Sequence, residues 1–251
     1  MNGEELARRV MLKLKERFDD VAVKAVARDT AMLKIWNNQP GVLQMWRDIR
    51  VSLLLGRQRR IAVLDLRVGS PEELLEVVNR VDEYITKVEE SELYASLPEP
   101  GKPSPLEGGY DKRVLDYLSD PRPLADAMVG AALSSGAERV AGTLELEDVE
   151  VSLVTSRGFE GSYRRTGVMA YLRSFRGDIS GHWAWGSTAV DERSIEGVGS
   201  RSAGLLGLAG ARSEFTPGRY DVILSPLVVG NLVNYVARMA MGMAVLLGMS
   251  F

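Results

Sequence analysis

Residues 217–226 read Pro-Gly-Arg-Tyr-Asp-Val-Ile-Leu-Ser-Pro, and this block organises the end of the chain. Its first two residues are typical of a turn, and residues 220–224 form an apolar run long enough for one buried strand. Pro226 suits the first turn of a helix, because the N–H at that position has no partner within the helix. Residues 227–249 are apolar on almost every face. The block therefore predicts a buried strand that leads into a buried helix.

That last helix is long enough to be tested as a membrane span, which needs about 20 apolar residues. It contains Asn231, Asn234 and Tyr235, and Arg238 near its middle. A central arginine costs about 2.5 kcal/mol or more in a bilayer. Small residues such as Gly230 and Ala237 permit close packing inside a protein instead. We therefore expect no membrane attachment.

Composition excludes several classes of function. The net charge of −3 gives no electrostatic reason to expect nucleic acid as a partner. The chain has no cysteine, so disulfides, thiol nucleophiles and thiolate metal ligands are excluded, and His182 is its one histidine. Residues 3–18 carry charges throughout and do not read as a signal peptide. We expect a cytoplasmic protein.

The first half of the chain reads as one α+β unit, residues 1–91. Leu6, Val10, Leu14 and Phe18 recur every four residues and predict an amphipathic helix over 3–18. Short strands are expected at 21–28, 31–36, one or two within 42–55, and 61–68, with a turn at 37–41. Ser70 and Pro71 begin a helix expected to run to residue 90, because Ser70 can cap it and Glu73 can reach back.

The second half repeats this order after a Pro/Gly-rich connector, residues 92–118. A helix is expected from Asp120 to Ser135, stopping at Gly136. Strands are expected at 138–146, 149–155, 161–173 and 179–188, followed by a small-residue helix over 191–211. The repeated helix–four-strand–helix pattern predicts an internal duplication, with the turn at 155–158 matching the one at 37–41. Residues 119–212 form the second α+β unit, and 213–251 begin a further domain.

Two motifs have a functional and a structural interpretation. In the run Gly-His-Trp-Ala-Trp-Gly at 181–186, His182 faces one side of a strand while Trp183 and Trp185 face the other. The tryptophans are either the wall of a binding surface or ordinary core residues, and the core interpretation is favoured. The run at 197–204 lacks the Lys-Ser/Thr ending of the Walker phosphate loop. It also lacks the third glycine of the dinucleotide-binding fingerprint, because Ser202 stands at that position. It is interpreted as a helix with small residues for close packing.

Five arginines cluster around the third and fourth expected strands of the second half. No two carboxylates have a spacing that singles them out as a catalytic pair. The arginines are Arg157, Arg164, Arg165, Arg173 and Arg176. They could bind an acidic partner, but a solvated face paired with Glu160, Asp178 and Asp191 is the commoner arrangement. No Gly-x-Ser-x-Gly elbow occurs, which disfavours a serine hydrolase.

Several blocks together resemble the TldD/PmbA (TldD/TldE) family, the "modulator of DNA gyrase" proteins. The blocks are Leu-Pro-Glu-Pro at 97–100, Tyr-Asp at 110–111, Thr-Ser-Arg-Gly at 155–158, the small-residue helix after Asp191, and above all residues 217–226. Their order and spacing fit across nearly the whole chain. The resemblance implies an N-terminal α+β domain before a β-rich C-terminal domain. It also implies a family that pairs a metallopeptidase subunit with a related, metal-free subunit.

The chain departs from the family's catalytic pattern. The catalytic subunit carries His-Glu-x-x-x-His on the helix after the Pro-Gly-x-Tyr-Asp-Val-Val-Leu block, and a further Cys ligand. Here the corresponding helix, 227–238, has neither His nor Glu, and the chain has no Cys. The resemblance therefore implies the metal-free TldE/PmbA type and only its N-terminal half. No cofactor is expected in this chain, and a zinc-type metal is expected only in a catalytic partner.

The resulting expectation is a non-catalytic subunit of a TldD/TldE-type peptidase, acting with a metal-bearing partner on unfolded or small peptides. The alternative is a homo-oligomeric binding module in which helix 227–249 self-associates, without a peptidase role. No catalytic and no metal-ligating residue is assigned. The candidate peptide- or partner-binding residues are Arg157, Arg165, His182, Trp183, Trp185, Tyr235 and Arg238.

Overall fold

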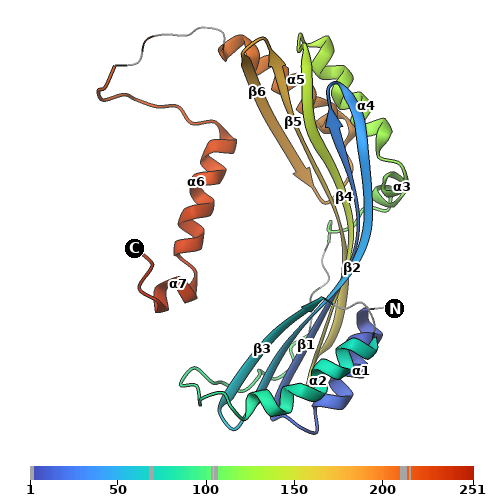
Figure 1. Ribbon diagram of the computed structural model, residues 1–251, viewed down its shortest axis with the longest axis vertical. Helices are drawn as coiled ribbons and strands as arrows, with labels where there is room; N and C mark the ends of the chain where they lie inside the picture. The colour runs from blue at the N-terminus through green and yellow to red at the C-terminus, as the bar shows by residue number, and fades with distance from the viewer. Residues whose placement is uncertain (1–2, 68–70, 103, 105–106, 210–213, 215) are drawn as a thin grey trace.

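A computed structural model describes residues 3–67, 71–102, 104, 107–209, 214 and 216–251 (Figure 1). The elements of the first half are α1 (Gly3–Leu14), β1 (Asp20–Trp36), β2 (Gln39–Arg57), β3 (Arg60–Arg67) and α2 (Pro71–Ile85). Those of the second half are α3 (Arg113–Ser119), α4 (Arg122–Ser134), β4 (Arg139–Thr155), β5 (Glu160–Arg176), β6 (Ile179–Ser187) and α5 (Glu192–Ala209). Two helices follow, α6 (Pro226–Met239) and α7 (Gly242–Leu246). The mixture of helices and an antiparallel sheet confirms the α+β fold class.

The six strands form one antiparallel sheet in the order β3-β2-β1-β4-β5-β6. The two halves meet where β1 pairs with β4, from Ala22 opposite Thr155 to Trp36 opposite Ala141. Each half runs outward from this seam as two consecutive hairpins, so the sheet has an approximate two-fold arrangement. The turn after β1 and the turn after β4 occupy matching places, as the expected duplication requires.

The strands are long, and their alternation gives the sheet two different faces. Along β1, Val21, Val23, Ala25, Ala31 and Leu33 are buried and face the helices. Their even-numbered neighbours face the other side, which we call the open face and against which no helix of the described ranges packs. Figure 1 shows that the sheet is curved, with α1 to α5 against its convex side and the open face on its concave side. Side chains toward the two ends of the open face, such as Lys24 and Trp36, are therefore exposed to solvent, whereas Thr30 at its middle is buried.

Two separate hydrophobic cores lie on the helix side. The first is formed by α1 and α2 against β1 and β2, and it contains Leu6, Val10, Leu14 and Phe18, as their spacing predicts. The second is formed by α3, α4 and α5 against β4, β5 and the far end of β1. Helices α4 and α5 lie so close together that a Cβ added at Gly199 would overlap the carbonyl oxygen of Met128. The run 197–204 thus lies within a helix and serves close packing.

The predicted number of strands is wrong, since the described residues of each half form three strands and not four. The predicted breaks at 29–30 and 147–148 lie inside the continuous strands β1 and β4. Asp29 pairs with Asp148 and Thr30 with Glu147, at the middle of the sheet between the two cores. Polar residues are compatible with a strand there, because their side chains find ionic partners: Asp148 binds Arg164 and Asp29 lies near Arg47.

Other boundaries differ in smaller ways. Residues 113–118, expected within the connector, belong to α3, which ends at Ser119. The helix predicted to 90 ends at Ile85, and the proposed cap Ser70 lies outside the described residues. Gly136 follows α4 in the left-handed region, with φ of 91°, and so ends that helix as predicted.

The end of the chain differs most from expectation. Residues 220–224 form no strand, and Ile223 is fully exposed. The helix predicted over 227–249 is divided into α6 and α7, and neither has a buried residue. Both stand apart from the sheet in Figure 1. An extended segment needs a neighbouring strand and an apolar helix needs a covering surface, and the described part of the chain supplies neither. No described helix is long and apolar enough to cross a membrane.

Candidate functional site

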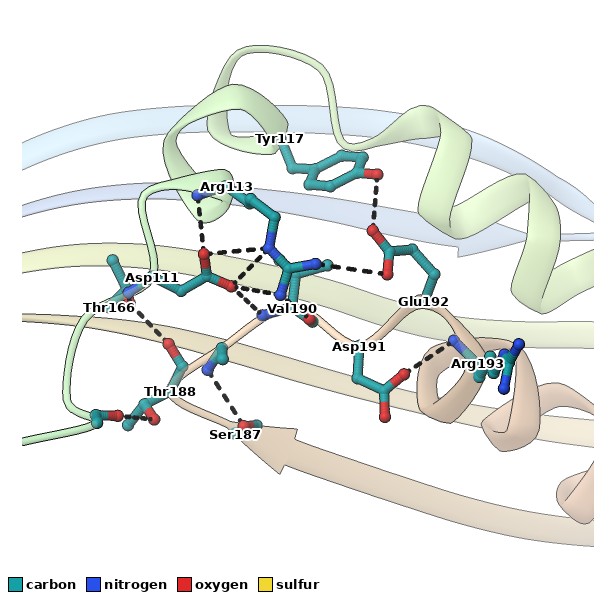
Figure 2. Close-up of polar contacts among 12 residues, drawn as sticks. Asp111, Arg113, Tyr117, Thr166, Ser187, Thr188, Val190, Asp191, Glu192 and Arg193 are labelled. Atoms are coloured by element: carbon teal, nitrogen blue, oxygen red, sulfur yellow. Dashed lines mark hydrogen bonds and ion pairs between the residues drawn. The ribbon is translucent and has the colours of Figure 1, made fainter.

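Asp111 anchors the returning connector to the second half of the sheet (Figure 2). Its carboxylate accepts hydrogen bonds from the backbone N–H of Val190 at 3.0 Å and from the side chain of Arg113 at 2.9 Å. Its own backbone N–H donates to the hydroxyl of Thr166 at 2.8 Å. Thr166 in turn donates to the carbonyl of Thr188 at 2.6 Å. The cluster joins the connector, β5 and the start of α5 at one point.

The charges of this cluster neutralise one another. Hydrogen bonds from the Arg113 side chain hold the pKa of Asp111 below its usual range, although partial burial acts the other way. Arg113 also donates to the carbonyl of Val190 at 2.7 Å, and Tyr117 donates to Glu192 at 3.2 Å. Every strong donor here has an acceptor within the cluster. The arrangement fixes the connector and leaves no acid or base poised for catalysis.

Arg157 belongs to a second anchor, at the start of β1. It lies in the turn after β4 and donates to the buried carboxylate of Asp20 at 3.3 Å. The same carboxylate accepts from the hydroxyl of Tyr94 at 2.5 Å and from the backbone N–H of Leu97 at 3.0 Å. Burial alone would raise the pKa of Asp20, but these hydrogen bonds outweigh it and the pKa is lowered. The Asp20 carboxylate therefore joins the first half, Arg157 of the second half and the connector.

Arg165 lies on the open face at the middle of the sheet. Its guanidinium donates to Glu147 at 2.6 Å, and the other oxygen of Glu147 lies 3.3 Å from Nε of Arg28. Gly167 makes room for this carboxylate, because a Cβ there would lie 2.8 Å from Cγ of Glu147. Arg165 is thus an ion-pair partner across β1, β4 and β5. Among the ion pairs found in the described chain, none joins one of the five clustered arginines to Glu160, Asp178 or Asp191, the partners expected from sequence.

The motif on β6 divides between the two faces as its alternation predicts. Trp183 and Trp185 are half-buried and pack against the second core, which favours their structural interpretation. Arg201 of α5 lies over the ring of Trp183, 5.4 Å from its centre. His182 is on the open face, edge-on to Tyr171 at 5.9 Å between ring centres. Partial burial, and then the charge of Arg173, lower the pKa of His182.

Beside His182 the open face is hollowed into an aromatic cleft of about 790 Å³. It is lined by Trp36, Tyr171, Lys34, Arg173 and the start of β2. Trp36 is 76% exposed although tryptophan usually contributes to cores. Trp36 and Tyr171 were not among the residues predicted from sequence, although Trp36 directly precedes a predicted turn and exposed aromatic residues near loops often bind ligands.

The outer edge of β2 borders this cleft. The pairing with β3 covers only Arg50–Arg57, so residues 39–49 have no strand on that side within the described chain. Val42 and Met45 are more than half exposed along this edge. An unpaired, apolar edge of this length can accept another strand.

The remaining candidates lie elsewhere. Tyr235 and Arg238 are on α6, where Tyr235 is 68% exposed. The structure therefore places His182, Trp183 and Trp185 on β6 and Tyr235 and Arg238 on α6, and it does not gather the seven candidate residues into one site. No group of three or more His, Cys, Asp and Glu side chains that could hold a metal is found in the described ranges.

The sheet consists of two half-sheets joined at their first strands, with helices on one face and an anchored connector. This arrangement defines an α+β protein of duplicated construction. Residues 112–206 match the family model described as the PmbA/TldA metallopeptidase central domain. The resemblance to the TldD/PmbA family expected from the motifs is thereby confirmed, and residues 112–206 are similar to that central domain. No curated protein matches the sequence.

Solved structures with the same fold carry consistent names. TldE from Thermococcus kodakarensis superposes with a TM-score of 0.65 at 14% identity, covering 80% of this chain and 47% of that one. A protein described as a modulator of DNA gyrase from Bacteroides thetaiotaomicron gives 0.76 at 15% identity, covering 94% and 56%. One from Thermotoga maritima gives 0.63 at 16% identity, covering 85% and 50%. The present chain thus spans about half the length of these structures.

Proposed function

We propose that this chain is the non-catalytic subunit of a TldD/TldE-type peptidase, and that it docks a metal-bearing subunit through α6. The observation that carries the proposal is the composition of α6. The helix reads Pro-Leu-Val-Val-Gly-Asn-Leu-Val-Asn-Tyr-Val-Ala-Arg-Met, with no side chain able to hold zinc in the place where the family's catalytic subunit has its ligands. The residues present do not fit a metal, so no catalytic step is assigned to this chain.

Docking is supported by the exposure of the same helix. Val229, Leu232, Val233 and Val236 follow the spacing of one helical stripe and are 41–58% exposed. An exposed apolar stripe of this kind is typical of a protein-binding helix. The metal-bearing subunit is the occupant that the family relationship favours.

Peptide binding is proposed at the open face beside the β2 edge. An extended peptide could add a strand along residues 39–49, where backbone groups have no partner strand. The aromatic cleft at Trp36 and Tyr171 adjoins this edge and offers apolar surface with the cations Lys34 and Arg173. Main-chain hydrogen bonds recognise unfolded peptides with little sequence preference, which suits such a subunit.

The test uses the purified chain and a His-Glu-x-x-x-His relative from the same genome. We expect a complex of defined stoichiometry by light scattering, with chelator-sensitive hydrolysis of an unfolded peptide in the mixture only. The double variant Val233→Asp/Val236→Asp should abolish the complex without unfolding the sheet, because both side chains are exposed. Leu12→Asp, at an exposed position of α1, is the matched control and should leave the complex intact. Peptide cleavage by the chain alone would contradict the proposal.

A homo-oligomeric binding module is the second candidate, and the same stripe on α6 favours it. In that case the chain alone would form a stable oligomer through α6. Val233→Asp/Val236→Asp would then convert it to a monomer, while the His-Glu-x-x-x-His relative would not bind. Light scattering of the wild-type chain and the variant distinguishes the two functions.

A further inference from the structure

A second hollow, of about 540 Å³, lies on the open face near the β3 edge of the sheet. We call it the basic hollow. The strand register places Lys24, Ser52 and Asp65 side by side in one row across β1, β2 and β3. The next row contains Arg50 and Arg67 opposite one another. Residues two apart share a face of a strand, so these side chains surround the same space.

The charges around the basic hollow are not balanced. Its cations are Lys24, Arg28, Arg50 and Arg67, and its acids are Asp48 and Asp65. Asp48 accepts from Arg50 at 3.2 Å, Asp65 accepts from Ser52 at 2.5 Å, and Arg28 lies against Glu147. The side chains of Lys24 and Arg67 make no hydrogen bond or ion pair within the described residues, and both residues are exposed. The hydroxyl of Ser52 does not neutralise Asp65, so the lining has four cations and two acids, and neither acid is bound by Lys24 or Arg67.

The pairing of Arg50 with Arg67 points in the same direction. Like charges directly opposite one another on neighbouring strands destabilise a sheet. An oxyanion placed between the two guanidinium groups would turn this repulsion into attraction, and guanidinium binds carboxylate or phosphate through paired hydrogen bonds. The arrangement is unfavourable for the sheet alone and favourable for an anion site.

An apolar shelf adjoins the cations. Leu54 and Val63 are opposite one another in the row beyond Ser52 and Asp65, on the same face. Their side chains are 37% and 63% exposed. A ligand whose charged end reaches Arg50 and Arg67 can therefore rest an apolar group on these two side chains. Because of these apolar side chains, the site suits a ligand with an apolar group better than it suits inorganic phosphate.

We propose that the basic hollow binds a carboxylate that carries a short apolar group. A free carboxylic acid and the carboxyl terminus of a peptide share this chemistry. The carboxylate lies between Arg67, Arg50 and Lys24, and the apolar group covers Leu54 and Val63. This site is distinct from the aromatic cleft and does not depend on the proposed subunit role.

The test is a titration of the purified full chain at low ionic strength, read from the methyl NMR signals of its leucines and valines. The probes are hexanoate, hexanamide, acetate and inorganic phosphate, together with a short peptide ending in leucine, with a free or an amidated terminus. We expect saturable shifts with hexanoate, none with hexanamide, and weaker binding of acetate. Arg67→Gln and Lys24→Gln should each weaken hexanoate binding about tenfold, and added salt should weaken it further.

Two further variants make the result decisive. Val63→Ser should weaken hexanoate but leave acetate unchanged, and Arg9→Gln, at an exposed position of α1, should change nothing. Tighter binding of the free-acid peptide than of hexanoate assigns the site to peptide termini, and the reverse assigns it to small acids. Equal binding of hexanamide, equal effects of Arg9→Gln and Arg67→Gln, or phosphate binding as tightly as hexanoate would each overturn the proposal.

Discussion

Asp20 at the start of β1 and Arg157 in the turn after β4 form an ion pair, 3.3 Å between Oδ1 and Nε, that joins the two halves of the sheet. Asp20 is 1% exposed, and it also receives Tyr94 and Leu97 from the connector. Three segments far apart in sequence therefore meet on one carboxylate. A buried carboxylate of this kind is stabilising only while all its donors are present.

Asp20→Asn should destabilise the protein by about 2 kcal/mol, because the buried group loses its charge-assisted hydrogen bonds. Tyr94→Phe removes one donor and should cost about 1 kcal/mol. The free energy of unfolding from urea denaturation measures both. Asp178→Asn, at an exposed turn position, is the control and should have no effect. An Asp20→Asn protein as stable as the control would show that the anchor is unimportant.

Stability should fall in acid because of the same group and of Asp111. The pKa of Asp20 and the pKa of Asp111 are both below the usual range, because hydrogen bonds in the folded state stabilise the two carboxylates. A lowered folded-state pKa stabilises the protein above the unfolded value of about 3.9 and loses this contribution as the pH falls through the folded value. Urea midpoints between pH 7 and pH 3 should drop more steeply in the wild type than in Asp20→Asn or Asp111→Asn. Parallel curves would rule the two groups out.

Gly199 and Gly197 provide a matched pair in α5. Gly199→Ala should destabilise the protein by about 2 kcal/mol or more, because its Cβ would overlap the backbone of α4 at Met128. Gly197 has no atom within 4 Å of an added Cβ, so Gly197→Ala should stabilise the helix by about 0.5–1 kcal/mol. Thermal unfolding of the two variants should therefore shift in opposite directions. Equal shifts would contradict the close contact of α4 and α5.

Gly167 and Glu147 should be energetically coupled. Gly167→Ala displaces the Glu147 side chain and weakens its ion pairs with Arg28 and Arg165, so we expect a loss of about 1–2 kcal/mol. In a Glu147→Ala background the same substitution should cost much less, because no side chain remains to clash. A double-mutant cycle measures this difference. Strict additivity would show that the carboxylate does not occupy the space over Gly167.

Local patterns were sufficient for most of the helices. The spacing of Leu6, Val10 and Leu14 predicts α1 and its buried face, and Gly136 predicts the end of α4. The strands of the sheet were placed correctly but divided wrongly at 29–30 and 147–148, because charged residues in a strand resemble a turn, and the strand predicted at 220–224 was wrong. They belong to the strand because their partners, such as Arg164 and Arg165, come from elsewhere in the sheet.

The candidate site was less predictable. Alternation correctly placed His182 opposite Trp183 and Trp185, since it depends only on the strand. The partners of Arg157 and Arg165 were not predictable, because Asp20 and Glu147 are brought near them by strand pairing across the duplication. Trp36 became a site residue only when the pairing of β1 with β4 placed it near Tyr171. Contacts of this kind are set by register, which sequence patterns do not specify.

The sequence by itself determined the α+β class, the repeated order of helices and strands, the family motifs, and the absence of metal ligands from the helix after residue 226. These features depend on residue type and on local periodicity. Only the tertiary structure decided that the two halves share one sheet, that the buried carboxylate of Asp20 joins them, and that Arg50 faces Arg67 beside an apolar shelf. It also decided that α6 is exposed, because burial depends on whether another surface is present and not on how apolar a helix is.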